Sequence, residues 1–232
     1  MTKFFAIIPA RGGSKRIPNK NIQLADGKPL IAFPILTAIS SGFFEEVIVS
    51  TDSEEIASIS RTFGASTPFL RDADLADDYT PTIPVIRDAL NRLPQIGADD
   101  IICCIYPTSI FLTNSMLSKA IEISPRLSKD NFIVSYTTFP YPIQRALQKD
   151  ATGTLSFFDP KNMSARSQDL DPAYHDAAQF YFARRLSWET QDSVFNDALG
   201  VEIPRRHVQD IDTFEDLENA RLILKLQNQS RS

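Results

Sequence analysis

The sequence predicts a three-layer α/β domain in which a mainly parallel sheet carries helices on both faces. Two observations support this prediction. Short apolar runs of strand length alternate with longer helix-like segments through the first two-thirds of the 232 residues, and such alternation favours parallel strands joined by right-handed crossovers. The composition is that of a globular protein, with 43% hydrophobic and 23% charged residues. We therefore expect one Rossmann-like domain over residues 1–232.

The expected strands are apolar runs bounded by turn residues, and the expected helices carry apolar residues at helical spacing. Strands are predicted at residues 4–8, 46–50, 67–70, 101–105 and 132–136. Helices are predicted at residues 30–41, 53–63, 82–93 and 114–123. Pro34 and Pro84 are expected in first turns or at kinks, because proline inside a helix removes a hydrogen bond.

The alternating pattern breaks down at residues 139–178. The segment is rich in breakers and aromatic residues, and a loop of this length in a compact domain is commonly functional. Its aromatic content argues against disorder and agrees with burial at an interface, so we expect an arm that projects from the sheet. The chain should return to the core at residues 180–182 and 200–203, form a helix over 213–226 and end in a disordered polar tail, 227–232.

Charge and cysteine content exclude several classes of partner. With 24 basic and 29 acidic residues the net charge is −5, which argues against a general nucleic-acid or anionic-membrane surface. No apolar run approaches membrane-spanning length. Cys103 and Cys104 are adjacent on a predicted strand and point to opposite faces, so a bridge between them is sterically poor. Buried free thiols fit a reducing cytoplasm, where we expect the protein to reside.

A basic loop follows the first predicted strand and is the most informative feature of the chain. Four cationic side chains fall within ten residues, with no acid among them: Arg11, Lys15, Arg16 and Lys20. Gly12 and Gly13 allow a tight turn that brings backbone N–H groups close to a ligand, which suits an oligophosphate. The alternative is a solvated turn. The spacing matches neither the Walker pattern nor G-x-G-x-x-G, so this would be another kind of phosphate loop.

The loop and the segment after it resemble one family closely. Residues 9–15 are Pro-Ala-Arg-Gly-Gly-Ser-Lys, residues 17–21 are Ile-Pro-Asn-Lys-Asn, and residues 27–30 are Gly-Lys-Pro-Leu. This is similar to the start of the CMP-sugar-acid synthetases (acylneuraminate cytidylyltransferases). The resemblance implies an enzyme that transfers CMP from CTP to an acidic nine-carbon sugar and releases pyrophosphate. It assigns these nucleotide-binding residues: Ala10, Arg11, Gly12, Gly13, Ser14, Lys15, Lys20 and Asn21.

The implied chemistry is attack by the anomeric hydroxyl of the sugar on the α-phosphorus of CTP. The catalytic residues would be Arg11, Lys15 and Lys20, which would neutralise the triphosphate and the departing pyrophosphate. No protein nucleophile is required, so we expect no covalent intermediate.

Asp210, Ile211 and Asp212 form the second informative pattern. Residues two apart in an extended segment share one side, so both carboxylates can face one point while Ile211 points inward. Two carboxylates with phosphate oxygens and water suit Mg²⁺. The alternative is that Asp212 or Thr213 only caps the following helix. The resemblance favours Asp210 and Asp212 as the metal site, whereas Asp52 is expected to help cap a helix.

Residues 71–82 resemble the family segment that recognises the cytosine base. The matching positions are Arg71, Thr80 and Thr82, and hydroxyl and guanidinium groups are suitable partners for the amino and carbonyl groups of cytosine. Hydroxyls ahead of a helix can also cap it, which is the alternative for the two threonines.

The expected sugar-binding residues are Tyr106, Arg166, Tyr174, His175, Gln179 and Tyr181. Tyr106 stands where the sialic-acid enzymes usually have glutamine, and residues 174–181 resemble the pseudaminic acid branch of the family. The predicted substrate is therefore pseudaminic acid. The alternatives are the same reaction on N-acetylneuraminic, legionaminic or Kdo-type acids, and a non-catalytic nucleotide-binding module.

In the resembled family the arm packs against a second subunit and contributes to its active site, so we expect a homodimer through residues 139–178. A hydrolase is disfavoured. The adjacent His175 and Asp176 cannot readily take the orientation of a catalytic triad, and no Gly-x-Ser-x-Gly motif is present.

Overall fold

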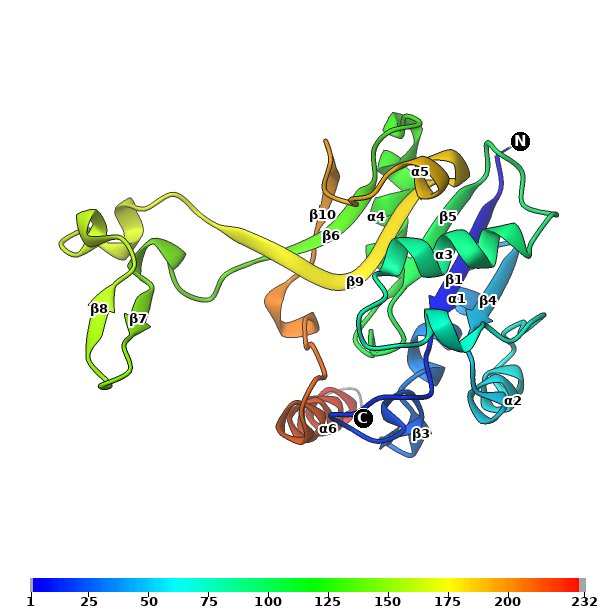
Figure 1. Ribbon diagram of the computed structural model, residues 1–232, viewed down its shortest axis with the longest axis horizontal. Coiled ribbons are helices and arrows are strands. Elements are labelled where there is room, and N and C mark those ends of the chain that lie inside the picture. The colour runs from blue at the N-terminus through cyan, green and yellow to red at the C-terminus, as the bar shows by residue number, and fades with distance from the viewer. Residues whose placement is uncertain (1, 230–232) are drawn as a thin grey trace.

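The computed structural model describes residues 2–229 and has a six-stranded sheet at its centre (Figure 1). The strand order is β10-β6-β9-β5-β1-β4. The strands are β1 (Phe4–Pro9), β4 (Glu46–Ser50), β5 (Ile101–Ile105), β6 (Ile133–Thr138), β9 (Tyr174–Arg184) and β10 (Leu199–Glu202). β1 pairs in parallel with β4 and β5, and β6 with β10, whereas β9 is antiparallel to both of its neighbours. The predicted, mainly parallel α/β sheet is confirmed.

Helices cover both faces of this sheet (Figure 1). They are α1 (Ala32–Ser41), α2 (Glu54–Thr62), α3 (Thr82–Asn91), α4 (Asn114–Ile123), α5 (Arg185–Thr190) and α6 (Phe214–Gln229). Apolar side chains of α1, α2 and α4 pack with Cys103 on one face, and those of α3 and α5 pack with Cys104 on the other. Both cysteines are buried and free, as predicted. Pro34 and Pro84 lie in the first turns of α1 and α3.

α6 packs in a third apolar cluster beside the basic loop. Its Leu217, Ala220 and Leu224 join Ile17 of the loop and Leu30. Between those two residues the chain makes a small hairpin of β2 (Leu24–Ala25) and β3 (Lys28–Pro29). α6 thereby holds the C-terminal segment against the loop that follows β1.

The arm projects from one end of the sheet and carries the hairpin of β7 (Leu147–Lys149) and β8 (Leu155–Phe157) (Figure 1). The Phe139 amide donates to the Ala173 carbonyl at 3.1 Å, so the two ends of the arm lie side by side. The exposed apolar side chains of the arm are Phe139, Tyr141, Ile143, Leu147, Leu155, Phe158 and Met163. A dimerisation role for the arm stays a prediction.

Several elements differ from the prediction. β9 begins at Tyr174, so the arm is shorter than the expected 139–178 and its last residues belong to the sheet. Residues 67–70 make only isolated bridges at Ser66 and Leu70, because Pro68 lacks the amide needed to continue a ladder. α5 was not expected at all.

The C-terminal helix is longer than predicted. α6 continues to Gln229, so the first half of the tail expected to be disordered is helical, while residues 230–232 lie outside the described part of the chain. No helix within residues 2–229 is both long and apolar enough to cross a membrane.

Candidate functional site

Most of the predicted nucleotide residues surround a cavity of about 400 Å³ beyond the carboxyl ends of β1 and β5, whereas Ala10, Gly12, Gly13 and Lys15 do not line it. Four segments far apart in the sequence line it: the loop after β1, the stretch 71–82, the loop 106–108 after β5, and residues 210–212. Ligands of open, mostly parallel sheets bind at this end of the strands. The predicted residues in the wall are Arg11, Ser14, Lys20, Asn21, Arg71, Thr80, Thr82, Tyr106, Asp210 and Asp212.

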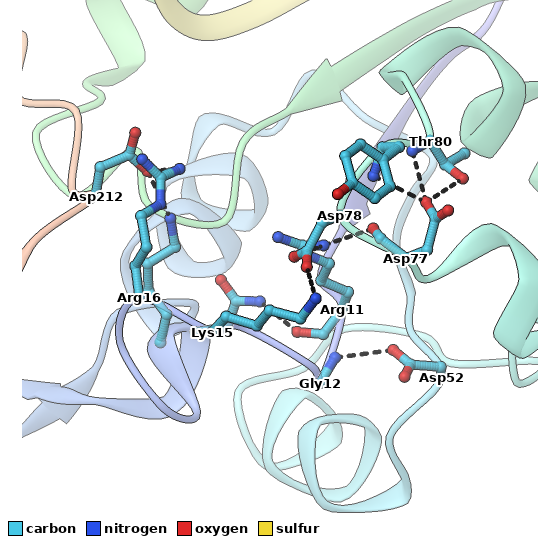
Figure 2. Close-up of polar contacts among 12 residues, drawn as sticks. Arg11, Gly12, Lys15, Arg16, Asp52, Asp77, Asp78, Thr80 and Asp212 are labelled. Atoms are coloured by element: carbon cyan, nitrogen blue, oxygen red, sulfur yellow. Dashed lines mark hydrogen bonds and ion pairs between the residues drawn. The ribbon is translucent and has the colours of Figure 1, made fainter.

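The backbone of the basic loop is held by hydrogen bonds from three directions. The Ala10 amide donates to the Ser50 carbonyl at 2.9 Å. The Gly12 amide donates to the Asp52 carboxylate at 2.8 Å (Figure 2). The Asn21 side-chain amide donates to the Arg11 carbonyl at 2.9 Å. The loop is therefore fixed before any ligand binds, which lowers the entropic cost of binding one.

Gly12 lies so close to α2 that a side chain does not fit there without a shift. A Cβ placed on it would stand 3.1 Å from the Ser53 Cβ. Gly13 has open space around it, with no heavy atom within 4 Å of a Cβ built on it. Gly12 therefore allows the loop to pack closely against the start of α2, whereas the space beside Gly13 is free of other protein atoms.

Two cations of the loop converge on one carboxylate. Arg11 Nη1 lies 2.6 Å from one oxygen of Asp78, and Lys15 Nζ lies 2.6 Å from the other (Figure 2). Arg11 Nη1 also donates to the Asp77 carbonyl. The hydrogen bond from Lys15, assisted by Arg11, lowers the pKa of Asp78. The pair can thus bind a single anionic group between them, which is what holding a phosphate requires.

Lys20 joins the loop to the Asp210–Asp212 segment. Its ammonium donates to the Ile211 carbonyl at 2.8 Å and to the Asp212 carboxylate at 3.2 Å, and Arg16 reaches the same carboxylate at 2.9 Å. Ile211 is buried, while both aspartates line the cavity, as the spacing predicts. Although Asp210 keeps an exposed surface, desolvation by the surrounding protein and then the Asp212 charge raise its pKa.

The helix cap beside this segment is made by other residues. The Thr213 hydroxyl accepts from the Asp216 amide at 3.2 Å, and the Asp216 carboxylate accepts from the Thr213 amide at 2.8 Å. This reciprocal pair has the geometry of a capping box. Capping is thus performed by Thr213 and Asp216, which leaves the Asp210 and Asp212 carboxylates facing the cavity.

The donor set at Asp210 and Asp212 fits Mg²⁺. Among residues 2–229, no protein group donates a hydrogen bond to the Asp210 carboxylate, and no cluster of three His, Cys, Asp or Glu side chains could form a metal cage alone. Mg²⁺ is commonly held by one or two carboxylates together with substrate phosphates and water. Two carboxylates facing a cavity that is also lined by cations of the basic loop match this pattern.

The predicted base-binding residues Arg71, Thr80 and Thr82 all line the cavity. Arg71 is 5% exposed, its guanidinium lies 3.9 Å from the Asp52 carboxylate, and burial lowers its pKa. Its Nε has no partner among the described residues. The Thr80 amide and hydroxyl both donate to Asp77, while the Thr82 hydroxyl lies 2.7 Å from the Tyr106 hydroxyl.

A second cavity of about 450 Å³ lies behind Thr82 and Tyr106, which line both cavities. Its wall is largely apolar and includes Tyr181, Val194 and Phe195. Desolvation raises the pKa of Tyr106 to about 12, so its hydroxyl stays protonated at neutral pH. This cavity offers an apolar surface with hydroxyl groups at its rim.

Four of the predicted sugar-binding residues do not reach either cavity within one chain. Gln179 is 3% exposed and donates to the Ala177 carbonyl. Arg166 pairs with Asp169 in the arm. Tyr174 packs against Tyr136, and His175 against Phe139, both at the base of the arm. Arg166 lies in the arm, Tyr174 and His175 lie at the start of β9 beside its base, and Gln179 is buried, so none of the four lines the chain's own nucleotide cavity.

Sequence reasoning missed three acidic residues around the basic loop. Asp52 does not cap α2, because Ser53 accepts from the Ile56 amide there; Asp52 holds Gly12 instead. Asp77 and Asp78 face Arg11 from a loop more than sixty residues away. A signal for Asp52 was present, since it directly follows a strand at the sheet edge where ligands bind. The two loop aspartates carried no such signal.

The fold, with a cationic loop and a carboxylate pair at one cavity, is that of a nucleotide-binding α/β enzyme. Residues 5–217 match the family model described as cytidylyltransferase, and the chain belongs to that family. It is accordingly a nucleotidyltransferase.

Similar proteins support the same assignment. The chain is 43% identical over 230 residues to a pseudaminic acid cytidylyltransferase of Campylobacter jejuni, which covers 98% of this chain and 99% of that protein. It is 32% identical over 231 residues to an N-acylneuraminate cytidylyltransferase of Escherichia coli, with 99% of this chain and 54% of that protein covered. The structure of a CMP:2-keto-3-deoxy-manno-octonic acid synthetase complexed with CTP superposes with a TM-score of 0.70 at 16% identity. That match covers 97% of this chain and all of the other, and it confirms the fold.

Proposed function

We propose that this enzyme transfers CMP from CTP to the anomeric hydroxyl of a nonulosonic acid, pseudaminic acid in particular, and releases pyrophosphate. The observation that carries the proposal is the meeting of the basic loop and the Asp210–Asp212 segment in one cavity at the carboxyl ends of the strands. Full-length similarity to proteins named pseudaminic acid cytidylyltransferase favours this acceptor.

In this proposal the chain's cations hold the triphosphate. Arg11 and Lys15 already converge on an anionic group, and Lys20 stands between the loop and the carboxylate pair. Their charges would stabilise the negative charge that develops on the departing pyrophosphate. Asp210 and Asp212 would hold Mg²⁺, which when bound acts as a Lewis acid on phosphate oxygens. No side chain has to act as a nucleophile.

The cavity behind Tyr106 supports the choice of acceptor. Pseudaminic acid ends in a methyl group and carries a second acetamido substituent, whereas a sialic acid has a glycerol tail that needs hydrogen-bonding partners. The wall formed with Val194 and Phe195 is largely apolar, and its polar members include Thr82, Arg87, Tyr106, Asp192 and Ser193. Hydroxyls desolvated without partners cost about 1–3 kcal/mol each, so such a wall disfavours the glycerol tail.

We also propose that the enzyme is a homodimer whose arm reaches the active site of a second copy. Arg166, Tyr174 and His175 would then act at the other subunit's site, which explains why they lie far from their own cavity. The exposed apolar residues of the arm support burial against a partner. The two buried free thiols and the use of CTP favour work in the cytoplasm.

The test is pyrophosphate release with CTP, Mg²⁺ and a set of sugar acids. Pseudaminic acid should be preferred over N-acetylneuraminic acid by at least about a hundredfold in kcat/KM. Two unpaired hydroxyls that each cost about 1.4 kcal/mol give this ratio, because about 1.4 kcal/mol corresponds to a factor of ten. Comparable rates with both acids would overturn the acceptor assignment, and preference for a legionaminic or Kdo-type acid would replace it. Replacing Mg²⁺ by a chelator should abolish release with every acid.

A further inference from the structure

The Asp176 side chain bonds to the walls of both cavities although it lines neither. One of its carboxylate oxygens accepts from the Ala178 amide at 2.9 Å, and the other accepts from the Tyr181 hydroxyl. Ala178 lines the nucleotide cavity, and Tyr181 lines the second cavity. A single carboxylate therefore fixes one wall residue of each cavity relative to the other.

The backbone at this point departs from a regular strand. The pairing of β9 with β6 shifts register between Val134 and Tyr136, and Ala178 has a φ of 47°. A left-handed conformation is disfavoured for alanine and persists only when neighbouring contacts impose it. The hydrogen bond from the Ala178 amide to Asp176 is such a contact, since aspartate commonly bonds the backbone two residues ahead.

Through Tyr181, Asp176 is also connected to the partition between the cavities, which Tyr106 and Thr82 form. The ring of Tyr181 meets the ring of Tyr106 edge-on, with centroids 5.7 Å apart. The Tyr106 hydroxyl lies 2.7 Å from that of Thr82, and both residues line both cavities. Asp176 thus acts on the partition through Tyr181, and on the nucleotide side through Ala178.

We propose that Asp176 is a positioning residue that sets the placement of the acceptor sugar relative to the α-phosphate of CTP. This inference rests on the proposed function, because it requires a nucleotide and an acceptor in adjoining cavities. Group transfer depends steeply on the alignment of the reacting atoms, and a misplacement of about 1 Å costs roughly a hundredfold in rate. Loss of Asp176 frees Tyr181 and the Ala178 bulge, so the acceptor is misaligned while CTP is still held by the basic loop.

The test compares Asp176→Ala, Tyr181→Phe and Asp176→Asn with the wild-type enzyme. Asp176→Ala should lower kcat/KM for the acceptor by about 30- to 100-fold, and Tyr181→Phe, which loses only one of the two contacts, by about tenfold. The Kd for CTP, measured by calorimetry, should stay within about threefold in both. Asp176→Asn keeps an oxygen for the Ala178 amide and an N–H for the Tyr181 oxygen, so it should recover most of the activity.

The matched control is Tyr136→Phe, because Tyr136 lies opposite Asp176 in β6 and no described residue hydrogen-bonds its hydroxyl. It should retain wild-type kinetics. The double variant Asp176→Ala/Tyr181→Phe should be no slower than Asp176→Ala alone, since coupled residues are not additive.

Each outcome decides the question. An acceptor kcat/KM within threefold of wild type in both Tyr181→Phe and Asp176→Ala would overturn the inference. A fall in CTP affinity as large as the fall in acceptor kcat/KM, together with a lower melting temperature, would also overturn it, because it indicates a merely structural carboxylate. If Asp176→Ala does not fold, the Tyr181→Phe and Asp176→Asn pair still decides. A wild-type enzyme that uses no sugar acid would instead refute the proposed function, and this inference with it.

Discussion

Lys20 links the two halves of the nucleotide cavity, the basic loop and the Asp210–Asp212 segment, by direct contacts. Its ammonium contacts Ile211 and Asp212 from a loop that is otherwise distant in sequence. Lys20→Ala should lower kcat by about 10²–10³-fold, the range observed when one charge-stabilising donor is removed. Steady-state pyrophosphate release measures this loss. Lys28→Ala, which removes an exposed lysine from β3, should leave the rate unchanged, and a Lys20→Ala enzyme of near-native rate would refute the proposed role.

Replacing the Asp210 carboxylate should abolish activity without destabilising the folded protein. Its pKa is raised in the folded protein by desolvation and by Asp212. A raised carboxyl pKa favours folding below the unfolded-state pKa, and that contribution is lost as pH rises through the folded-state value. Near neutral pH the ionised group is therefore a cost, which Asp210→Asn removes, and solvent screening keeps this cost small because Asp210 is exposed.

The expected result is a variant that lacks Mg²⁺-dependent activity but is at least as stable as wild type without ligand. The free energy of unfolding at pH 7 should be equal within about 0.5 kcal/mol or higher. The advantage of the variant should shrink as pH falls below the raised pKa of Asp210. Thermal unfolding at several pH values, with activity assayed in parallel, measures both effects. A clear loss of stability at pH 7 would indicate a structural carboxylate instead.

At the scale of the single residue, the sequence predicted the relative placement of residues that lie close together along the chain. Asp210 and Asp212 were expected on one side of an extended segment, and the cavity contains both. The partner of Arg11 and Lys15 could not be predicted, because Asp78 comes from a loop whose position depends on the whole sheet. Spacing along the chain carries no information about such long-range pairs.

At the scale of secondary structure, the boundary between the Asp210–Asp212 segment and α6 can be tested separately. Thr213 and Asp216 cap the helix. Thr213→Ala should lower the free energy of unfolding by about 1 kcal/mol, which corresponds to a fall of roughly 2–4 °C in Tm for a chain of this size. The Mg²⁺ concentration giving half-maximal rate should not change. A large shift in that concentration would mean that cap and metal site are one unit.

Strands and helices that carry regular apolar patterns were predictable, and irregular ones were not. β4 and α4 match their predicted bounds, since apolar runs and helical spacing are complete within them. β9 was recognised only at residues 180–182, because its first residues, including His175 and Asp176, are polar and look like loop. α5 has only six residues, too few for a periodic signal.

At the scale of the whole molecule, the order of strands could not be derived from periodicity. The antiparallel β9 enters the middle of the sheet only after the arm reverses the chain. Its position places Ala178 and Tyr181 at the two cavities. The active site therefore depends on a strand whose direction is set by the arm, a feature that no local pattern encodes.

Deletion of the arm should convert a dimer into a folded, inactive monomer. Because Phe139 and Ala173 already share a hydrogen bond, an Asn-Gly turn can replace residues 140–172 and let β6 continue directly into β9. The three apolar clusters of the core lie outside the arm, so folding should persist.

The exposed apolar side chains of the arm, such as Tyr141 at 80% and Phe158 at 70% exposure, have no cover within one chain. Sedimentation should show a full-length dimer and a monomeric variant that unfolds cooperatively. A full-length protein that sediments as an active monomer would show that the arm does not serve dimerisation.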